Sequence, residues 1–487
     1  MTKTTTQEPI AGRDRSIIEA RGIDHIPRGE RRGSPWQLGA MWSGVVLNVQ
    51  VVVYGALLVV FGLSPWQCVA AIAIGSLTWI FAGLTSLAGP AAGTTAFTVT
   101  RAPFGRNGAR PLAAFNWIMQ VGYEVLDLVL MVLAVSALLG MAGVHVGRPL
   151  QIALIVALSV GQSLLPLVGH AAITRALHAL VVPFAAVFVI LAWLTASRLH
   201  LHDSAPAGWA AFLGGIALAA SGSGLGWAPN APDYSRYLPV SASRAKIVAA
   251  VTLGGGIPQA LLMLLGVGVA FVAPDASDPV GGLQGHYPSW FLVLFLLLLT
   301  CQMGALNAVD LYSSGVTLQA AGLKVARWQA VVLDGVICTV ISIVVVFSGS
   351  FNTFLSDFLL FMIVWFAPWT AILIVDYLLR RGRYDIASLD SAPGGRYIRG
   401  GGVHLPGVIA QALGMAASLL WIDTSVFTGP LSRAGNGIDL SVPAGLIVGG
   451  LAYLVLAARG VRAESAAQLP AESAVPLSAG FMEGTVA

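Results

Sequence analysis

Charged residues are scarce in this sequence, where Asp, Glu, Lys and Arg together make up 10% of 487 residues. Soluble domains carry about 25%, so a soluble multidomain protein is excluded. Apolar residues account for 56% of the chain, and the mean hydropathy is +0.81. This composition predicts an integral membrane protein, with the lipid bilayer as its surroundings.

Cysteine is also rare, and the common enzyme motifs are missing. The three cysteines, Cys68, Cys301 and Cys338, all fall in apolar runs, so we expect no disulfide framework. The sequence contains no GxxxxGK(S/T) loop, no HExxH, no paired CxxC and no GxSxG. We therefore expect a protein that is not an enzyme and that has no metal site and no cofactor apart from a coupling ion.

Long apolar runs are abundant, and twelve of them reach the length of about 20 residues that a membrane helix needs. The runs lie near 37–61, 65–88, 112–140, 148–167, 175–197, 208–230, 247–272, 289–322, 327–348, 353–378, 405–422 and 442–458. They predict an all-α transmembrane domain over 37–458. Residues 1–36 form a charged N-terminal tail without the apolar core of a signal peptide. Residues 459–487 are rich in Ala, Ser, Glu and Pro, a composition typical of disorder.

Basic residues are distributed unevenly between the two sides of this predicted domain. If the N-terminus is cytoplasmic, all 26 Lys and Arg lie on the cytoplasmic side except Arg148, Arg198 and Arg433. Such a bias sets the orientation of membrane proteins. We expect a multi-pass protein of the cell (inner or plasma) membrane with both termini in the cytoplasm. The basic net charge then follows from topology and needs no nucleic-acid partner.

Two of the apolar runs are interrupted by residues that break helices. The sixth run leads into SGSGLGWAPNAPDYSRYLP at 221–239, and the first contains MWSGVVLNVQ, with Ser43, Gly44, Asn48 and Gln50. The backbone groups freed by such breaks are tolerated at membrane depth only beside a cavity or within protein. Interruptions at matching positions of two halves indicate a transporter's binding site. The alternative is that the small residues only allow helices to pack closely.

Polar residues at membrane depth form two further stripes. The third run has Asn116, Gln120, Tyr123, Glu124 and Asp127 on one face, and the eighth has Asn307, Asp310 and Ser314. Polar groups inside a membrane are costly and are therefore candidates for function. The alternative for both stripes is a structural ladder of hydrogen bonds between helices.

Four segments give the chain a resemblance to the nucleobase–cation symporter family, in its purine and cytosine permease branch. They are GW followed by PDYSRYLP within 226–239, the pair Gly122–Tyr123, NAVDLYS at 307–313, and APWTAILIVDYLLRRGRYD at 367–385. The resemblance extends over nearly the whole membrane region. The PDYSRYLP and APWTAILIVDYLLRRGRYD segments are its most specific parts.

The resemblance implies a LeuT-type fold, in which helices 1–5 and 6–10 are inverted repeats, helices 11 and 12 are additions, and helices 1 and 6 are broken. It also implies that a flat heterocycle lies between aromatic residues of helices 3 and 6, here Tyr123 and Trp227. Stacking a base on an aromatic face contributes about 1–3 kcal/mol and accepts many rings. The further candidate substrate-binding residues are Asp127, Asn307, Gln120, Asn48, Gly226 and Ser223.

The chain departs from the family pattern in helices 3 and 8. Tyr123 stands where relatives usually have tryptophan, and Asp127 where they usually have an amide. Ala305 and Leu306 stand where sodium-coupled relatives have hydroxyl residues that bind the ion. We therefore expect coupling to H⁺ and not to Na⁺, although the backbone carbonyls of a broken helix 1 remain an alternative place for a cation.

The candidate proton-coupling residues are Asp127, Glu124 and Asp310. A carboxylate at membrane depth is costly unless it is paired or protonated, which suits a proton carrier. An ionised Asp127 only accepts hydrogen bonds, so it would suit an aminopyrimidine or aminopurine edge. The alternative for Asp127 is a structural contact with another helix.

The sequence thus predicts a secondary transporter that imports a nucleobase such as cytosine or a purine, in symport with a cation. The runner-up ligands are allantoin, a hydantoin and a thiamine-precursor pyrimidine, with Na⁺ as the alternative coupling ion. A passive channel would need a pore-lining selectivity element, and the sequence has no repeated filter motif or charged ring. A membrane-embedded enzyme is the remaining alternative, for which Glu124 and Asp127 are the acidic candidates.

Overall fold

The computed structural model describes residues 25–168, 170–200, 205–276, 278, 280–323, 327–348, 351–389 and 395–466. Over these residues the chain is helical, and its β-structure is limited to one isolated bridge between Asp423 and Thr428. The three cysteines are free. The predicted all-α class is therefore confirmed. Most of both predicted tails, 1–24 and 467–487, lies outside the described residues.

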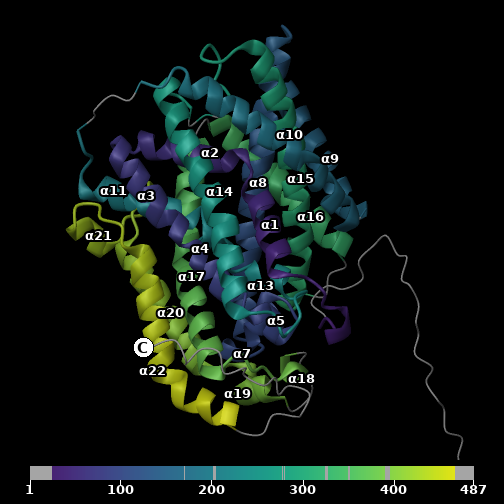
Figure 1. Ribbon diagram of the computed structural model, residues 1–487, viewed down its shortest axis with the longest axis vertical. Helices are drawn as coiled ribbons and strands as arrows, with labels where there is room; N and C mark the ends of the chain where they lie inside the picture. Colours follow the sequence, from purple (N-terminus) through teal and green to yellow (C-terminus); the bar gives the residue numbers. More distant parts are fainter. Residues whose placement is uncertain are drawn as a thin grey trace, which may run out of the picture.

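The helices are numbered in chain order in Figure 1. Their bounds are α1 Pro35–Val46, α2 Val49–Val60, α3 Pro65–Leu77, α4 Trp79–Thr85, α5 Ala88–Ala92, α6 Ala96–Val99, α7 Arg101–Phe104, α8 Ala109–Met141, α9 Arg148–Val168, α10 His170–Ala196, α11 Trp209–Ser221, α12 Gly224–Trp227, α13 Ala231–Ser235, α14 Arg244–Val272, α15 Ser289–Ala320, α16 Arg327–Ser348, α17 Phe351–Arg380, α18 Ile386–Leu389, α19 Arg399–Gly402, α20 Leu405–Trp421, α21 Pro430–Ala434 and α22 Ser441–Ala466. Short 3₁₀ turns occupy Arg28–Glu30 and Arg396–Ile398.

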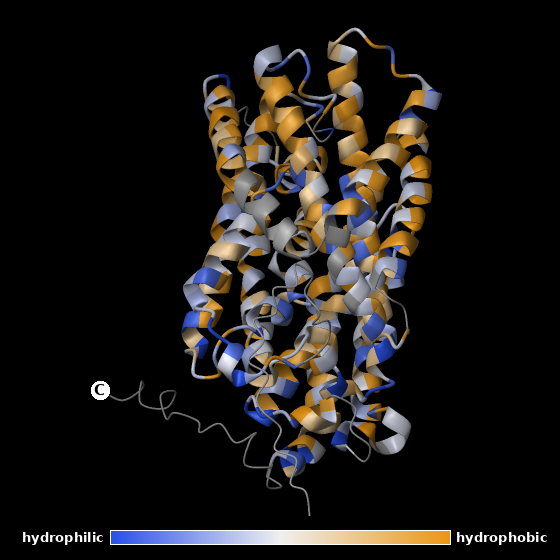
Figure 2. Cartoon of the chain, turned by 90° about the vertical axis from the view of Figure 1, so that its right-hand side faces the viewer, coloured by the Kyte–Doolittle hydropathy of each residue, from blue (hydrophilic) through white to orange (hydrophobic). Residues whose placement is uncertain are grey.

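Within the described residues, nine helical stretches are long and apolar enough to cross a membrane, and the bent pair α1–α2 makes ten. Two shorter apolar stretches, Arg148–Leu164 in α9 and Val181–Ala196 in α10, stand at the remaining predicted positions. The count of twelve spans stays a prediction. Figure 2 shows hydrophobic residues along the helices in the upper part of the bundle and hydrophilic residues gathered toward its lower end.

The N-terminal tail ends earlier than the sequence predicted, and the C-terminal tail begins later. Helix α22 continues to Ala466, past the predicted end at 458. Hydropathy falls where charged residues begin, but Glu464 pairs with Arg380 of α17 at 2.9 Å and extends the ordered helix. Before α1, Arg31 is buried and donates to the carbonyls of Pro90 and Ile26, at 2.9 and 2.8 Å. Neither segment is a free tail.

The packing of the helices has a repeated pattern. Helices α1 and α2 pack on α14, and α11 packs on α3; α9 packs on α15, and α16 packs on α8. Counted as membrane spans, span 1 packs on span 7 as span 6 packs on span 2, and span 4 packs on span 8 as span 9 packs on span 3. Each contact therefore has a counterpart when spans 1–5 are matched in order with spans 6–10. Helices α20 and α22 pack on each other and on α17, at one side of the bundle (Figure 1). The pattern agrees with two five-helix repeats plus two additions, and their inverted relation stays a prediction.

Helix 1 is broken between α1 and α2, whose axes differ by 60°. Asn48 lies at the break with an extended backbone, φ −141° and ψ 162°. Its Oδ1 accepts from the Val51 N–H at 3.1 Å, which caps α2, while its Nδ2 donates to the Val45 carbonyl at 3.1 Å. One asparagine therefore satisfies backbone groups of both segments, as membrane depth requires.

Helix 6 is broken between α11 and α12. The Gly222 carbonyl, freed at the end of α11, accepts from Gln259 Nε2 of α14 at 3.0 Å. The Leu225 N–H donates to Thr78 Oγ1 at 3.3 Å. At Gly224 a Cβ atom would overlap the backbone at the start of α4, so the approach of these two elements requires glycine. Both predicted breaks are present.

The APWTAILIVDYLLRRGRYD segment ends α17 and carries a buried ion pair. Asp376 and Arg380 are 0% and 3% exposed, and Arg380 Nε donates to Asp376 at 2.9 Å. Tyr453 of α22 donates its hydroxyl to Asp376 Oδ1 at 2.7 Å. With the contact between Arg380 and Glu464, this network joins α17 to α22.

We expect Arg380→Met to destabilise the protein strongly. The substitution leaves the Asp376 carboxylate buried without its cation, and breaking a buried pair in this way costs about 3–5 kcal/mol. Thermal unfolding of the purified protein measures the effect, with Arg381→Met as the control because Arg381 is exposed. Equal melting temperatures for the two variants would show that the pair contributes nothing to stability.

Candidate functional site

A small cavity lies where helices 1 and 6 are broken. It encloses about 30 Å³ and is lined by Val46, Asn48, Gln50, Val51, Tyr54, Tyr123, Asp127, Gly222, Trp227, Gln259, Leu306 and Asp310. These residues come from α1, α2, α8, α12, α14, α15 and the two breaks. A water needs about 10–15 Å³ of such space. The cavity therefore has room for water, and a heterocycle needs its walls to move apart.

Two aromatic side chains of the cavity are held from behind by other rings. Trp227 of α12 meets Trp42 of α1 edge-on, with ring centroids 5.5 Å apart and planes at 66°. Tyr123 of α8 meets Phe358 of α17 at 5.1 Å and 89°. Edge-to-face contacts of this kind are favourable and fix the ring planes. The cavity thus has two oriented aromatic walls.

Asp127 is the most deeply buried acidic side chain of the cavity, at 2% exposed. It lies one helical turn after Tyr123, on the same face of α8. Gln50 Nε2 donates to Asp127 Oδ1, and the Tyr54 hydroxyl donates to Gln50 Oε1 at 3.4 Å. Asp127 Oδ2 has no hydrogen bond to the described residues. A chain of hydrogen bonds from α2 therefore orients this carboxyl group.

Asp310 of α15 is half-buried and also lines the cavity, one turn after Leu306. Its carboxyl group and that of Asp127 belong to the lining of the same cavity. Gln259 of α14 uses its Nε2 to donate to the Gly222 carbonyl, and its Oε1 is buried without a hydrogen bond in the described structure. The cavity therefore combines two carboxyl groups with an unused amide oxygen.

Four of the predicted binding residues lie elsewhere. Asn307 points to the interface of α15 with α8 and α9, where its Nδ2 donates to the Glu124 carbonyl at 3.1 Å and to Gln162 Oε1 at 2.7 Å. Gln120 and Ser223 are 1% and 0% exposed but do not line the cavity. Gly226 is not in the lining either, and a Cβ atom there would be 2.2 Å from the Ser221 carbonyl oxygen. Their roles in binding stay predictions.

The three proton-coupling candidates do not all lie at the cavity. Asp127 and Asp310 line the cavity, while Glu124 does not. Glu124 is 0% exposed, and neither carboxyl oxygen makes a hydrogen bond within the described part of the chain. The backbone carbonyl of Glu124 accepts from Asn307 of α15. Glu124 therefore lies where α8 packs against α9 and α15.

Three polar cavity residues were among neither the predicted binding residues nor the proton-coupling candidates. Gln50 and Tyr54 follow the break in helix 1, and Gln259 follows Pro258 in α14. A signal existed for Gln50 and Gln259, because each is an amide within an apolar run. Tyr54 carries no such signal, since tyrosines are common in membrane helices.

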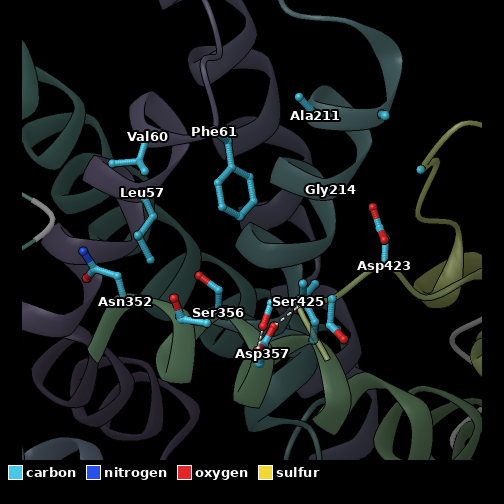
Figure 3. Close-up of a pocket in the computed structure, with 15 residues that line it drawn as sticks. Leu57, Val60, Phe61, Ala211, Gly214, Asn352, Ser356, Asp357, Asp423 and Ser425 are labelled. Atoms are coloured by element: carbon cyan, nitrogen blue, oxygen red, sulfur yellow. Dashed lines mark hydrogen bonds between the residues drawn. The ribbon is translucent and has the colours of Figure 1, made fainter. Parts of the chain in front are cut away.

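A larger pocket of about 490 Å³ lies beyond the small cavity along α2 (Figure 3). The C-terminal end of α2 and the beginnings of α11 and α17 line it, together with parts of the segment 423–437. Leu57 belongs to this pocket and Tyr54 to the small cavity, so one turn of α2 separates them. Asp357 accepts from the backbone N–H of Ser425 at 2.9 Å and from its hydroxyl, which joins α17 to the 423–437 segment.

Two broken helices around a cavity with aromatic walls and buried carboxyl groups define a class of protein, the secondary transporters of small molecules. Residues 25–445 match the family described as permeases for cytosine/purines, uracil, thiamine and allantoin. The chain belongs to this family. It is therefore a permease and not an enzyme, as the sequence predicted.

Similar sequences come from bacteria and fungi. The chain is 30% identical over 459 residues to YxlA of Bacillus subtilis, a candidate purine-cytosine permease, with 90% of this chain and 96% of that protein covered. It is 26% identical over 476 residues to the purine-cytosine permease fcyB of Emericella nidulans, with 90% and 88% covered.

Solved structures show the same fold. Mhp1, a transporter of the nucleobase-cation-symport-1 family in a closed conformation with bromovinylhydantoin bound, aligns with a TM-score of 0.71 at 19% identity, covering 92% of this chain and 97% of that one. The inward-facing conformation of Mhp1 gives a TM-score of 0.70, also at 19% identity, covering 92% and 95%. The likeness confirms the predicted transporter fold.

Proposed function

We propose that this permease imports a nucleobase such as cytosine or a purine, or a similar flat nitrogen heterocycle, by alternating access. The observation that carries the proposal is the cavity itself, whose lining brings Trp227 and Tyr123 together with Asn48, Asp127 and Asp310. Aromatic faces bind any flat ring, and hydrogen-bonding groups select among rings. The names of its relatives support the same class of substrate.

The orientation belongs to the same proposal. The bias of basic residues favours a cell membrane location with both termini, and the tails 1–36 and 459–487, on the cytoplasmic side. Helix α2 then runs from the small cavity toward the outer face, and the larger pocket opens outward. A ring that enters this pocket reaches the cavity only when the intervening wall moves, and it leaves inward only when the opposite wall moves. Such a sequence is alternating access.

We assign coupling to H⁺ because the carbonyl oxygens at the break in helix 1 already accept hydrogen bonds from protein groups. The Val45 carbonyl accepts from Asn48 Nδ2 at 3.1 Å, and the Val46 carbonyl accepts from the Asn48 N–H at 2.7 Å. The Leu47 carbonyl accepts from Gln302 Nε2 of α15. On the facing helix, Ala305 has no side-chain oxygen, whereas Na⁺ needs oxygen ligands. Asp127 and Asp310 are then the proton carriers in the cavity.

Concentrative uptake tests the proposed function and its coupling together. We expect purified protein in liposomes to accumulate labelled cytosine or adenine against its gradient when the outside is made acidic. The accumulation should disappear on addition of a proton ionophore and should not depend on Na⁺. Equilibration without accumulation under any ion gradient would indicate a channel. Accumulation that needs a sodium gradient and ignores the ionophore would contradict proton coupling.

Allantoin, a hydantoin or a thiamine-precursor pyrimidine remains the second candidate for the substrate. The family description includes thiamine and allantoin, and the Mhp1 structure holds a hydantoin. Each of these compounds contains a flat ring that can stack on Trp227 or Tyr123 once the walls of the cavity move apart. The same liposomes, supplied from the outside with each labelled compound in turn, rank these candidates by their uptake.

A further inference from the structure

The larger pocket has the size of a binding site in its own right. Its volume is about 490 Å³, compared with about 30 Å³ for the small cavity. Sites for small molecules typically enclose about 300–1,000 Å³. A heterocycle therefore fits into the larger pocket as it stands, whereas the small cavity admits one only after its walls have moved apart.

An aromatic ring contributes to the wall of this pocket. Phe61 directly follows the last residue of α2, and its side chain is half-buried against the hydrophobic core. Figure 3 shows the ring directed into the pocket, toward the α17 side where Ser356 and Asp357 lie. Any nucleobase can stack on an aromatic side chain, because every base has a π-face. Phe61 therefore offers a stacking surface outside the small cavity.

Polar groups of the larger pocket are available to a ligand. Thr353 and Ser356 of α17 belong to its lining, and their hydroxyl groups make no hydrogen bond to the described residues. Asp423 accepts from the Thr428 hydroxyl at 2.8 Å through Oδ1, while its Oδ2 has no hydrogen-bond partner in the described part of the chain. Hydroxyl groups donate and accept, and carboxylate oxygens only accept. A heterocycle that brings N–H groups and a ring nitrogen or carbonyl thus finds partners here.

The segment 423–437 gives the pocket a fixed wall of one charge sign. Asp357 accepts from the N–H and the hydroxyl of Ser425, and Asp439 accepts from the Asp423 N–H at 3.0 Å. These contacts hold the segment, which connects α20 to α22, against the beginning of α17. The lining has two carboxyl groups, those of Asp357 and Asp423, and no Lys, Arg or His. A pocket lined by one sign of charge attracts neutral or cationic rings with N–H donors and repels anions.

We propose that the larger pocket is a second, weaker binding site for the transported heterocycle, which stacks on Phe61 and donates its N–H groups to Asp357 and Asp423. Leu57 lines this pocket and Tyr54 lines the small cavity, so a ring bound at Phe61 lies about one turn of α2 from the next site. The second site is weaker because its polar groups are partly exposed to water, where a hydrogen bond gains little. This inference rests on the proposed function and adds a binding step to it.

Equilibrium binding to the full-length purified protein tests the inference, with labelled cytosine or adenine as the probe, whichever the liposomes accumulate. We expect the wild type to show a weak class of sites in addition to a tight one. Phe61→Ala should lower the affinity of the weak class by about fivefold or more, as the loss of a stacking face requires, and leave the tight class unchanged. Trp227→Ala should have the reverse effect. Phe61→Tyr keeps an aromatic face and should keep both classes.

Two further variants make the result independent of folding. Trp209→Ala is the matched control, because Trp209 at the start of α11 is 70% exposed and belongs to the lining of neither site. We expect it to keep both classes. If Phe61→Ala does not fold, Phe61→Leu takes its place, since leucine keeps an apolar side chain at the end of α2 but has no ring.

The outcomes separate the second site from the function beneath it. A single class of sites in a wild type that concentrates its substrate would overturn the second site and leave the proposed function intact. A weak class that persists unchanged in Phe61→Ala or Phe61→Leu would also overturn the inference, because the ligand would then bind elsewhere. Neither binding nor uptake of any heterocycle by the wild type would overturn the second site and the proposed function together.

Discussion

We expect Trp227→Ala to abolish uptake while the amount of protein in the membrane stays near that of the wild type. The substitution removes a stacking face that contributes about 1–3 kcal/mol to the binding of a base. Trp42, which holds Trp227 from behind, keeps its contacts with Trp79 and Tyr234 at 5.3 and 5.2 Å, so the break region retains its packing. Uptake of labelled substrate by expressing cells, normalised to membrane protein, measures the effect.

Two variants serve as controls for this experiment. Trp227→Phe keeps an aromatic face and should retain partial uptake. Trp193→Ala removes a tryptophan of α10 that is 68% exposed on the outside of the bundle, and it should behave like the wild type. Uptake near the wild-type level in Trp227→Ala would show that the tryptophan is not a wall of the substrate site.

The second large effect is expected from Asp127→Asn, which should lose accumulation against a gradient. Asparagine has nearly the shape of aspartate and can still accept from Gln50 Nε2, so the packing around α8 should be kept. It cannot carry a proton. The variant should therefore equilibrate substrate across the membrane, with uptake that no longer rises when the outside is made acidic.

Asp334→Asn is the matched control for the loss of a buried carboxyl group. Asp334 is 0% exposed and accepts from Trp117 Nε1 at 2.8 Å and Ser314 Oγ at 2.5 Å, away from the cavity. We expect this variant to concentrate substrate. If Asp127→Asn also concentrates substrate with an unchanged response to outside pH, Asp127 is neither the proton carrier nor the source of ligand preference, and Glu124 or Asp310 takes that role.

The order and type of the membrane helices could be predicted because hydropathy and length alone decide them. Helix α16 has the bounds of the predicted run 327–348. The breaks were predictable as well, because several small or polar residues lie close together in each of the two interrupted runs, Ser43, Gly44, Asn48 and Gln50 in the first and SGSGLGWAPNAP in the sixth. The end of α22 was not, because the ion pair between Glu464 and Arg380 joins residues that are far apart in sequence.

The direction in which each polar side chain points was harder to predict. Asn307 and Asp310 were assigned to one stripe, yet Asp310 lines the cavity with Leu306 while Asn307 turns toward Gln162. Successive residues of a helix are rotated by about 100°, so a wide stripe borders two neighbouring helices at once. Which residue meets the cavity depends on the rotation of the helix, and that rotation is set by packing against its neighbours.

The same division occurs on α8. Tyr123 and Asp127, four residues apart, line the cavity, whereas Asn116 donates to Asn230 Oδ1 at 3.3 Å in another part of the bundle. Gln259 was missed because it comes from α14, a helix whose sequence shows no polar stripe. Its position became visible only when the packing of α14 against the broken helices was known.

The central claim is that a flat heterocycle binds between the breaks of helices 1 and 6, against Trp227. The most direct test is ligand binding to purified protein, first by thermal shift with a panel of nucleobases, aminopyrimidines and hydantoins, since binding raises apparent stability. The affinity of the best compound is then measured for the wild type, Trp227→Ala and Trp193→Ala. The account predicts equal affinities for the wild type and Trp193→Ala, and an affinity about fivefold or more lower for Trp227→Ala, as a loss of 1 kcal/mol or more requires. Unchanged affinity in Trp227→Ala would contradict it.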